Sequence, residues 1–216
     1  ITGAFSGNGE SCISSSLCLI QENIYDDFIS KLIERVRQIK LGPPLESESN
    51  MGPLAHEKQV DFLETQIEKS LGEGATLLIG GKRAVNLGSS LYFEPTIISC
   101  PDRSISVSRT ELFAPCLSVI KFHREEEAIS IANDSEYGLS SGVFTESNER
   151  AERVSKAIDA GICFINCYRF ISPHVSFQGR KWSGYGFESG YDAIQSMQVK
   201  KSIWTSTAVS YTHLRA

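Results

Sequence analysis

The sequence is poor in several features that would each indicate a particular class of protein. Its 216 residues contain no long Lys/Arg run, and the formal net charge is −5. A protein that binds nucleic acid or anionic lipid is expected to carry a basic cluster, so neither partner is predicted. No apolar segment is long enough to span a bilayer. We therefore expect a folded globular protein with neither nucleic acid nor membrane as a partner.

The cysteines and histidines lack the spacings of metal sites and disulfide scaffolds. The six cysteines stand at positions 12, 18, 100, 116, 163 and 167, and no Cys-x-x-Cys pair or neighbouring histidine completes a tetrahedral ligand set. The four histidines are scattered, and none pairs with a carboxylate at a spacing typical of a Cys/His hydrolase. We expect reduced thiols, no metal, and a cytoplasmic protein, an organelle being left open. The chain starts at Ile1 without a signal peptide, and we expect it to be part of a longer polypeptide.

The sequence does contain regular apolar patterns. With 41% hydrophobic and 22% charged residues it can bury one substantial core. Helical spacing of apolar residues predicts helices over 24–41, 60–72 and 125–133 and from about residue 148. Strands are predicted over 13–20, 75–79, 91–98, 116–122, 139–144 and 161–166, with Pro95 confining its segment to an edge or a bend. This alternation predicts an α/β fold with a largely parallel sheet flanked by helices.

Cys12 is the strongest candidate for chemistry. Gly7 and Gly9 permit positive φ and close approach of a ligand, and a strand is expected directly after the cysteine. A cysteine in such a loop can be exposed and surrounded by backbone N–H groups, which favour the thiolate and stabilise an oxyanion. The alternative is that Cys12 is simply a small buried apolar residue.

Weaker candidates lie downstream. Glu111 and Phe113 share one face of an extended chain, so the carboxylate can accept hydrogen bonds from ribose hydroxyls while the ring packs beside a flat heterocycle. An exposed acid next to a core aromatic explains the same pattern. Asn166, at the end of an apolar strand, can orient a substrate or cap the segment after that strand. The glycine-dense segment 177–190 does not fit a strand-to-helix pattern, so a phosphate-binding loop is not predicted.

The order of these motifs along residues 4–205 resembles the aldehyde dehydrogenase superfamily. The resemblance rests on Gly9-Glu10-Ser11-Cys12, Lys40-Leu41-Gly42-Pro43-Pro44, Met51-Gly52-Pro53-Leu54, Glu111-Leu112-Phe113-Ala114-Pro115, Asn133 with Tyr137-Gly138-Leu139, Asn166, and Ser183-Gly184-Tyr185-Gly186. The resemblance implies that this chain is the C-terminal part of the catalytic domain of such an enzyme.

The resemblance also assigns roles to individual residues. Cys12 is expected to be the nucleophile, with Ser11 on the substrate side, and Glu10 is the less common acidic variant of the motif. Glu111 is expected to hold the ribose of NAD or NADP, with Phe113 beside the nicotinamide. The remaining two residues are placed less specifically: Asn166 matches a position near the substrate, and Glu188 matches the second acidic position of the family, with a catalytic or structural role.

The implied activity is oxidation of an aldehyde to a carboxylic acid through a thiohemiacetal and a thioester on the cysteine. The family's oxyanion-hole Asn, its general-base Glu and its Rossmann coenzyme domain lie upstream of the cysteine motif and are absent from this sequence, so the isolated chain is expected to lack turnover. The alternative is a non-catalytic structural or interaction protein of the same fold.

The resemblance also sets the expected domain bounds, and two parts of the sequence depart from it. Residues 1–200 are expected to form the catalytic domain, 201–209 the start of a strand that joins a neighbouring subunit in a homo-oligomer, dimer or tetramer, and 210–216 a non-native tail. Phe187 stands where the family commonly has Arg, and 176–181 differs from the usual motif, so the particular aldehyde is not predicted.

Overall fold

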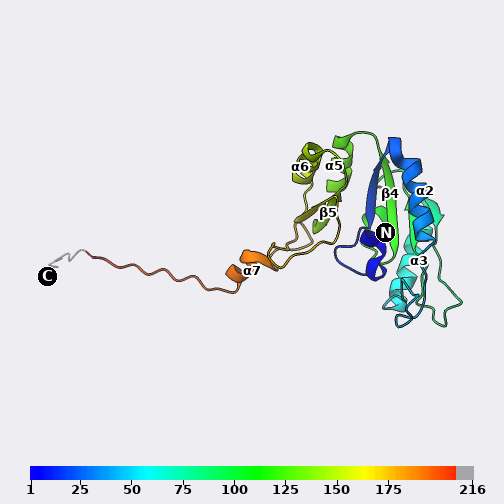
Figure 1. The fold of residues 1–216 in the computed structure, drawn as a ribbon, viewed down its shortest axis with the longest axis horizontal. Helices are drawn as coiled ribbons and strands as arrows, with labels where there is room; N and C mark the ends of the chain where they lie inside the picture. Colours follow the sequence, from blue (N-terminus) through cyan, green and yellow to red (C-terminus); the bar gives the residue numbers. More distant parts are fainter. Residues whose placement is uncertain (208–216) are drawn as a thin grey trace.

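The computed structural model describes residues 1–207, and its main feature is a four-stranded sheet with helices on both faces (Figure 1). The strands are β1 (Leu17–Gln21), β2 (Thr76–Ile79), β3 (Thr96–Ser99), β4 (Cys116–Phe122), β5 (Ser140–Val143) and β6 (Ile162–Ile165). The α-helices are α1 (Thr2–Phe5), α2 (Tyr25–Val36), α3 (Glu57–Gly72), α4 (Ser106–Arg109), α5 (Glu125–Asn133), α6 (Asn148–Ala157) and α7 (Gly190–Ser196). Two short 3₁₀ helices are η1 (Ser6–Gly9) and η2 (Glu22–Ile24).

The strands pair in the order β1-β4-β3-β2, and β5 pairs with β6 in a second sheet. The pairs β1–β4, β3–β4 and β5–β6 are parallel, and among the strands of residues 1–207 only β2 runs antiparallel to its neighbour, β3. The prediction of an α/β fold with a largely parallel sheet flanked by helices is therefore confirmed. β1 and β5 are both edge strands in this part of the chain.

The two faces of the larger sheet are buried by different helices, because successive side chains of a strand point to opposite sides. Ile98 and Ile120 pack with α3 on one face, and their neighbours Ile97 and Val119 pack with α2 on the other. Val60 of α3 is fully buried, and burial of a Val or Leu side chain stabilises the folded state by about 1.5–3 kcal/mol. The apolar residues that recur at helical spacing in the sequence are therefore the ones buried in the core.

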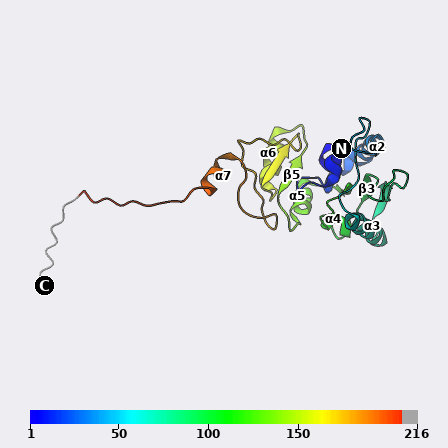
Figure 2. The ribbon, with the colours of Figure 1, turned by 90° about the horizontal axis from the view of Figure 1, so that it is seen from below.

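The second sheet packs with α5 and α6 beside the larger sheet, with the N-terminal segment between them (Figure 2). Glu125 of α5 accepts two hydrogen bonds from Arg153 of α6, at 2.7 and 2.9 Å, so this pair joins two helices. Glu149, one turn before Arg153 in the same helix, forms no hydrogen bond or ion pair with it within residues 1–207. The bidentate geometry with Glu125 offers the guanidinium a better match than a single i,i+4 contact.

Two strand predictions need correction. The segment expected as a strand over 13–20 begins to pair only at Leu17, because Ser14 N–H donates to the Ser11 carbonyl and Ile13 lies in a turn. The strand expected over 91–98 begins only at Thr96, directly after Pro95, and this strand, β3, lies inside the sheet between β4 and β2 and not at an edge.

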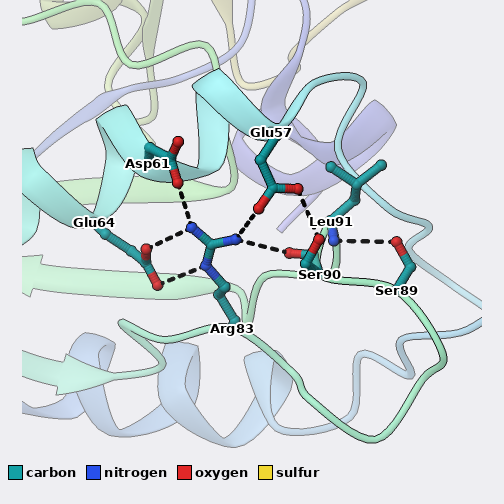
Figure 3. Close-up of polar contacts among 7 residues, drawn as sticks. All are labelled: Glu57, Asp61, Glu64, Arg83, Ser89, Ser90 and Leu91. Carbon is teal, nitrogen blue, oxygen red and sulfur yellow. Dashed lines mark hydrogen bonds and ion pairs between the residues drawn. The ribbon is translucent and has the colours of Figure 1, made fainter.

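A cluster of ionic contacts holds the segment between β2 and β3 on α3 (Figure 3). The Arg83 guanidinium donates to Glu64 at 2.8 and 3.0 Å, to Asp61 at 2.5 Å and to Glu57. The Ser90 hydroxyl donates to the second oxygen of Glu57 at 2.7 Å. The hydrogen bond with Glu64, and after it that with Glu57, raises the pKa of Arg83. Three carboxylates on one helix thus share one cation.

The C-terminal part leaves the body of the molecule. Beyond α7 the chain extends away from both sheets without regular secondary structure as far as residue 207 (Figure 1). Residues 201–207 therefore form no strand within this single chain, and their pairing with another subunit stays a prediction. The predicted tail 210–216 lies outside the described residues. None of the helices formed by residues 1–207 is long and apolar enough to cross a membrane.

Candidate functional site

Cys12 lies exposed at the tip of a turn that closes between Ser11 and Ser14, where the Ser14 N–H donates to the Ser11 carbonyl at 2.9 Å. We call residues 6–14 the cysteine loop. Its start runs through three successive positive φ angles, at Gly7 (61°), Asn8 (59°) and Gly9 (71°). This backbone path turns the chain out of α1 and η1 and presents the thiol to solvent.

The backbone N–H of Cys12 donates to no acceptor among the hydrogen bonds of residues 1–207. A free N–H on the nucleophile's own residue is available to an oxygen that becomes negative when the thiolate attacks a carbonyl carbon. The predicted nucleophile and an N–H available as an oxyanion donor therefore belong to the same residue.

The cysteine loop is fixed from one side by the loop that carries Glu111 (residues 110–115, the Glu111 loop). A Cβ placed on Gly9 would stand 2.3 Å from the Ala114 carbonyl oxygen, so the two backbones touch where Gly9 has no side chain. Asn8 Nδ2 donates to the Pro53 carbonyl at 2.8 Å, and Glu10 Oε1 accepts from the Ala55 N–H at 3.0 Å. Glu10 therefore anchors the loop to a neighbouring segment.

The Glu111 loop presents two exposed side chains around one buried residue. Leu112 is buried in the core, while Glu111 is exposed and the Phe113 side chain is 42% exposed at a positive φ of 48°. Gln59 of α3 donates to the carbonyls of Leu112 and, at 3.4 Å, Phe113. The loop is thus fixed by its backbone and by Leu112, which leaves the carboxylate and the ring free to contact a ligand.

A cleft of about 620 Å³ joins these two loops. Ser11, Cys12, Glu111 and Phe113 all line it, together with residues of β1 and β5. The structure therefore brings together the predicted nucleophile and both residues predicted to hold a coenzyme. The Glu111 carboxylate has no hydrogen bond or ion pair within residues 1–207, which fits a role as acceptor for ribose hydroxyls, and the open Phe113 ring fits a flat heterocycle.

Asn166 and Glu188 do not line this cleft. The Asn166 side chain accepts from the Thr145 N–H and donates to the Thr145 carbonyl, both at 2.9 Å, so it joins the ends of β6 and β5. Glu188 is exposed, and its backbone exchanges two hydrogen bonds with Phe177 in the glycine-dense segment. The substrate role of Asn166 and the catalytic role of Glu188 stay predictions.

Four of the other five cysteines are partly or fully buried, and burial raises the pKa of each. The pKa is raised to about 11 for Cys18 and Cys100 and to about 12 for Cys116, and it is also raised for Cys163. Buried thiols of this kind are held in the unreactive protonated form. Cys167 is exposed like Cys12 but does not line the cleft.

Sequence reasoning missed the residues that hold the loops in place. Asn8 and Gln59 each bond a carbonyl 45 or more residues away, and Arg169 Nη1 donates to the Ser6 carbonyl across 163 residues at 2.9 Å. Only Asn8, a side-chain amide between two glycines, gave a local signal. The other two depend on tertiary contacts that periodicity does not encode.

Comparison with known proteins gives consistent matches. The profile of the aldehyde dehydrogenase family matches residues 1–203. The chain is 42% identical over 205 residues to (Z)-2-((N-methylformamido)methylene)-5-hydroxybutyrolactone dehydrogenase of Acinetobacter baylyi, covering 94% of this chain and 42% of the relative. It is 39% identical over 194 residues to the chloroplastic betaine aldehyde dehydrogenase of Beta vulgaris, covering 90% and 39%. It therefore spans about two fifths of the length of these relatives.

The fold matches solved structures equally well. An apo point mutant of betaine aldehyde dehydrogenase from Staphylococcus aureus, with a BME-modified cysteine, superposes with a TM-score of 0.94 at 34% identity, covering 100% of this chain and 43% of that one. The complex of that betaine aldehyde dehydrogenase with NAD+ gives a TM-score of 0.93 at 35% identity, covering 99% and 43%. From the family match along nearly the whole chain and this agreement in fold, the chain belongs to the aldehyde dehydrogenase family.

Proposed function

We propose that this chain is the C-terminal, catalytic-domain part of an enzyme that oxidises an aldehyde to a carboxylic acid with NAD or NADP. The observation that carries the proposal is the meeting of Cys12, Glu111 and Phe113 on one cleft, with their loops in backbone contact at Gly9 and Ala114. The related proteins include betaine aldehyde dehydrogenases, and a related structure contains NAD+, which supports this reaction class.

The position of Cys12 determines its chemistry. The thiolate attacks the aldehyde carbon, a C–S bond forms, and the oxygen of the resulting thiohemiacetal takes the negative charge. The free Cys12 N–H is available to donate to that oxygen. With bound NAD(P) as the hydride acceptor, a thioester would remain on Cys12, and attack by water would break the C–S bond, releasing the acid and, with loss of a proton, restoring the thiolate.

Glu111 and Phe113 are the residues of this chain that would hold the coenzyme. When bound, NAD(P) supplies the hydride acceptor. The Glu111 carboxylate would orient the nicotinamide ribose through its hydroxyls, and the Phe113 ring would limit where the flat nicotinamide can lie. Both side chains project from a backbone that Gln59 holds to α3, so the position of that backbone is set before a ligand arrives.

The remaining machinery belongs to the parent protein. We propose that a second oxyanion donor, a general base and the rest of the coenzyme site come from sequence outside this chain, so that the isolated chain forms a covalent adduct but does not turn over. An NAD-dependent rate with an aldehyde, measured on the isolated chain, would contradict this. Assembly as a homo-oligomer and a cytoplasmic location are further proposals for the parent.

A thiol-labelling experiment tests the proposed role of Cys12. The chain is alkylated with iodoacetamide near neutral pH and the modified peptides are quantified over time by mass spectrometry. Cys167 is the matched control because it is also exposed, whereas thiols with a pKa of about 11, such as Cys18, have only about one molecule in ten thousand ionised at pH 7. We expect Cys12 to react at least about tenfold faster than Cys167, because its thiol lies in a loop with a free backbone N–H on the candidate cleft. Equal rates would favour the alternative, a non-catalytic protein of this fold.

A further inference from the structure

The segment after β6 connects the second sheet to the cysteine loop. The Tyr168 ring fills a space that two glycines leave open: a Cβ on Gly3 of α1 would stand 3.1 Å from the ring, and one on Gly142 of β5 would stand 2.9 Å from it. The Phe164 ring of β6 packs against Tyr168 with centroids 5.1 Å apart. One aromatic ring is therefore held between the N-terminal helix and the second sheet.

Arg169 continues this connection to the cysteine loop itself. Its Nη1 donates to the Ser6 carbonyl at 2.9 Å, at the start of η1 and six residues before Cys12. The guanidinium forms no ion pair with a carboxylate within residues 1–207, so the Ser6 carbonyl is the acceptor that fixes it. Arg169 also adopts a positive φ of 61°, which non-glycine residues rarely keep unless their surroundings hold them there.

The other end of the segment is held as firmly. Asn166, at a φ of 53°, bonds both backbone groups of Thr145 at the end of β5. The segment 166–169 is thus tied to β5 at one end and to the cysteine loop at the other. Asn8, Gly9 and Glu10 hold the loop against 53–55 and the Glu111 loop, so Arg169 adds the restraint from the second sheet.

We propose that Arg169 is a positioning residue for Cys12, with Tyr168 setting the place from which it acts. The hydrogen bond to Ser6 keeps the start of the positive-φ path in register, and this path determines where the Cys12 thiol and its N–H point. The proposal rests on the proposed function, because it assigns meaning to the reactivity of Cys12.

The test uses three substitutions at Arg169, made in the full chain with Cys167→Ser so that the neighbouring exposed thiol does not interfere. Arg169→Lys keeps the charge and a donor, Arg169→Gln keeps a donor without the charge, and Arg169→Met keeps neither. The alkylation rate of Cys12 is measured from about pH 6 to about pH 9, together with hydrogen exchange of the amides of residues 3–12.

We expect Arg169→Met to slow alkylation of Cys12 about fivefold at neutral pH and to speed exchange in the loop. Arg169→Lys should stay within about twofold of the parent, and Arg169→Gln should fall between the two. An unchanged or faster alkylation in Arg169→Met overturns the proposal. A slow Cys12 in the parent chain would instead contradict the proposed function, so the two failures are distinguishable.

A second variant reaches the same contact without altering Arg169. Gly142→Ala places a methyl group against the Tyr168 ring, at a glycine whose φ is not positive, so its effect is steric. We expect Gly142→Ala to slow Cys12 in the same direction, and to add little when combined with Arg169→Met. Gly72→Ala is the matched control, because a Cβ there meets nothing within 4 Å. Equal effects of the two alanine variants would overturn the role of Tyr168.

Discussion

The contact between Gly9 and Ala114 makes the strongest prediction for the site. Gly9→Ala adds a Cβ at a φ of 71°, and that Cβ would stand 2.3 Å from the Ala114 carbonyl oxygen and 3.1 Å from the Ala4 carbonyl oxygen. Restoring an ordinary contact requires the two loops to separate by about 1 Å. The left-handed backbone costs about 1–2 kcal/mol for an L-residue and overpacking about 1–3 kcal/mol. We expect the free energy of unfolding to fall by about 2–5 kcal/mol.

Gly7→Ala provides the control, because Gly7 has nearly the same φ, 61°, but a Cβ there meets nothing within 4 Å. It should lose only the backbone term, about 1–2 kcal/mol. Urea unfolding of both variants, monitored by circular dichroism, measures the difference. If Gly9→Ala lowers the free energy of unfolding no more than Gly7→Ala does, the cysteine loop and the Glu111 loop are not in the contact described.

The same separation has a consequence for activity. A displacement of about 1 Å between a nucleophile and a bound substrate or coenzyme can cost on the order of a hundredfold in rate. In the proposed parent enzyme, Gly9→Ala should therefore lower kcat by about two orders of magnitude, and Gly7→Ala should lower it far less. Steady-state rates with a saturating aldehyde would show equal losses if the contact did not matter.

Two further predictions concern stability. Arg83→Met leaves Glu57, Asp61 and Glu64 without their shared cation, so the urea midpoint should fall at low ionic strength and the deficit should shrink in about 1 M NaCl; a deficit independent of salt would contradict an ionic origin. Hydrogen bonds from the Ser106 hydroxyl and N–H lower the pKa of Glu73 in the folded chain, so its contribution is present above the unfolded pKa of about 4.3 and is lost as the pH falls through the folded value. Glu73→Gln should lower the urea midpoint at pH 7, and the difference from the parent chain should close in acid; a constant difference would refute the linkage.

The periodic part of the fold could be predicted from the sequence. Val60, Leu63 and Ile67 recur at helical spacing and are the residues that α3 buries, because the hydrophobic effect acts on each segment's own pattern. Strand limits were less accurate where a turn formed first. The hydrogen bond from Ser14 to Ser11 delays the start of β1 to Leu17, and no apolar pattern records that bond.

The sequence marks the candidate residues of the site but not the residues that hold their loops in place. Cys12, Glu111 and Phe113 were predicted from glycines and an ordered set of motifs; the structure places all three on one cleft, and their roles stay predictions. The partner of Arg169 lies 163 residues away, so its role depends on tertiary packing that the local sequence does not carry. Asn166 differs from both: the sequence marked it as a candidate for substrate binding, and in the structure its side-chain amide forms hydrogen bonds with the Thr145 backbone.

The ring of Tyr168 also restricts how this part of the molecule can change in sequence. Because the ring occupies the volume that a side chain at Gly3 or Gly142 would need, the sizes of the residues at these three positions depend on one another. A larger residue at Gly3 or Gly142 requires a smaller side chain at position 168. Chimeras with a relative should therefore exchange residues 1–16, 140–143 and 162–169 together, since swapping one segment alone brings two side chains into the same place.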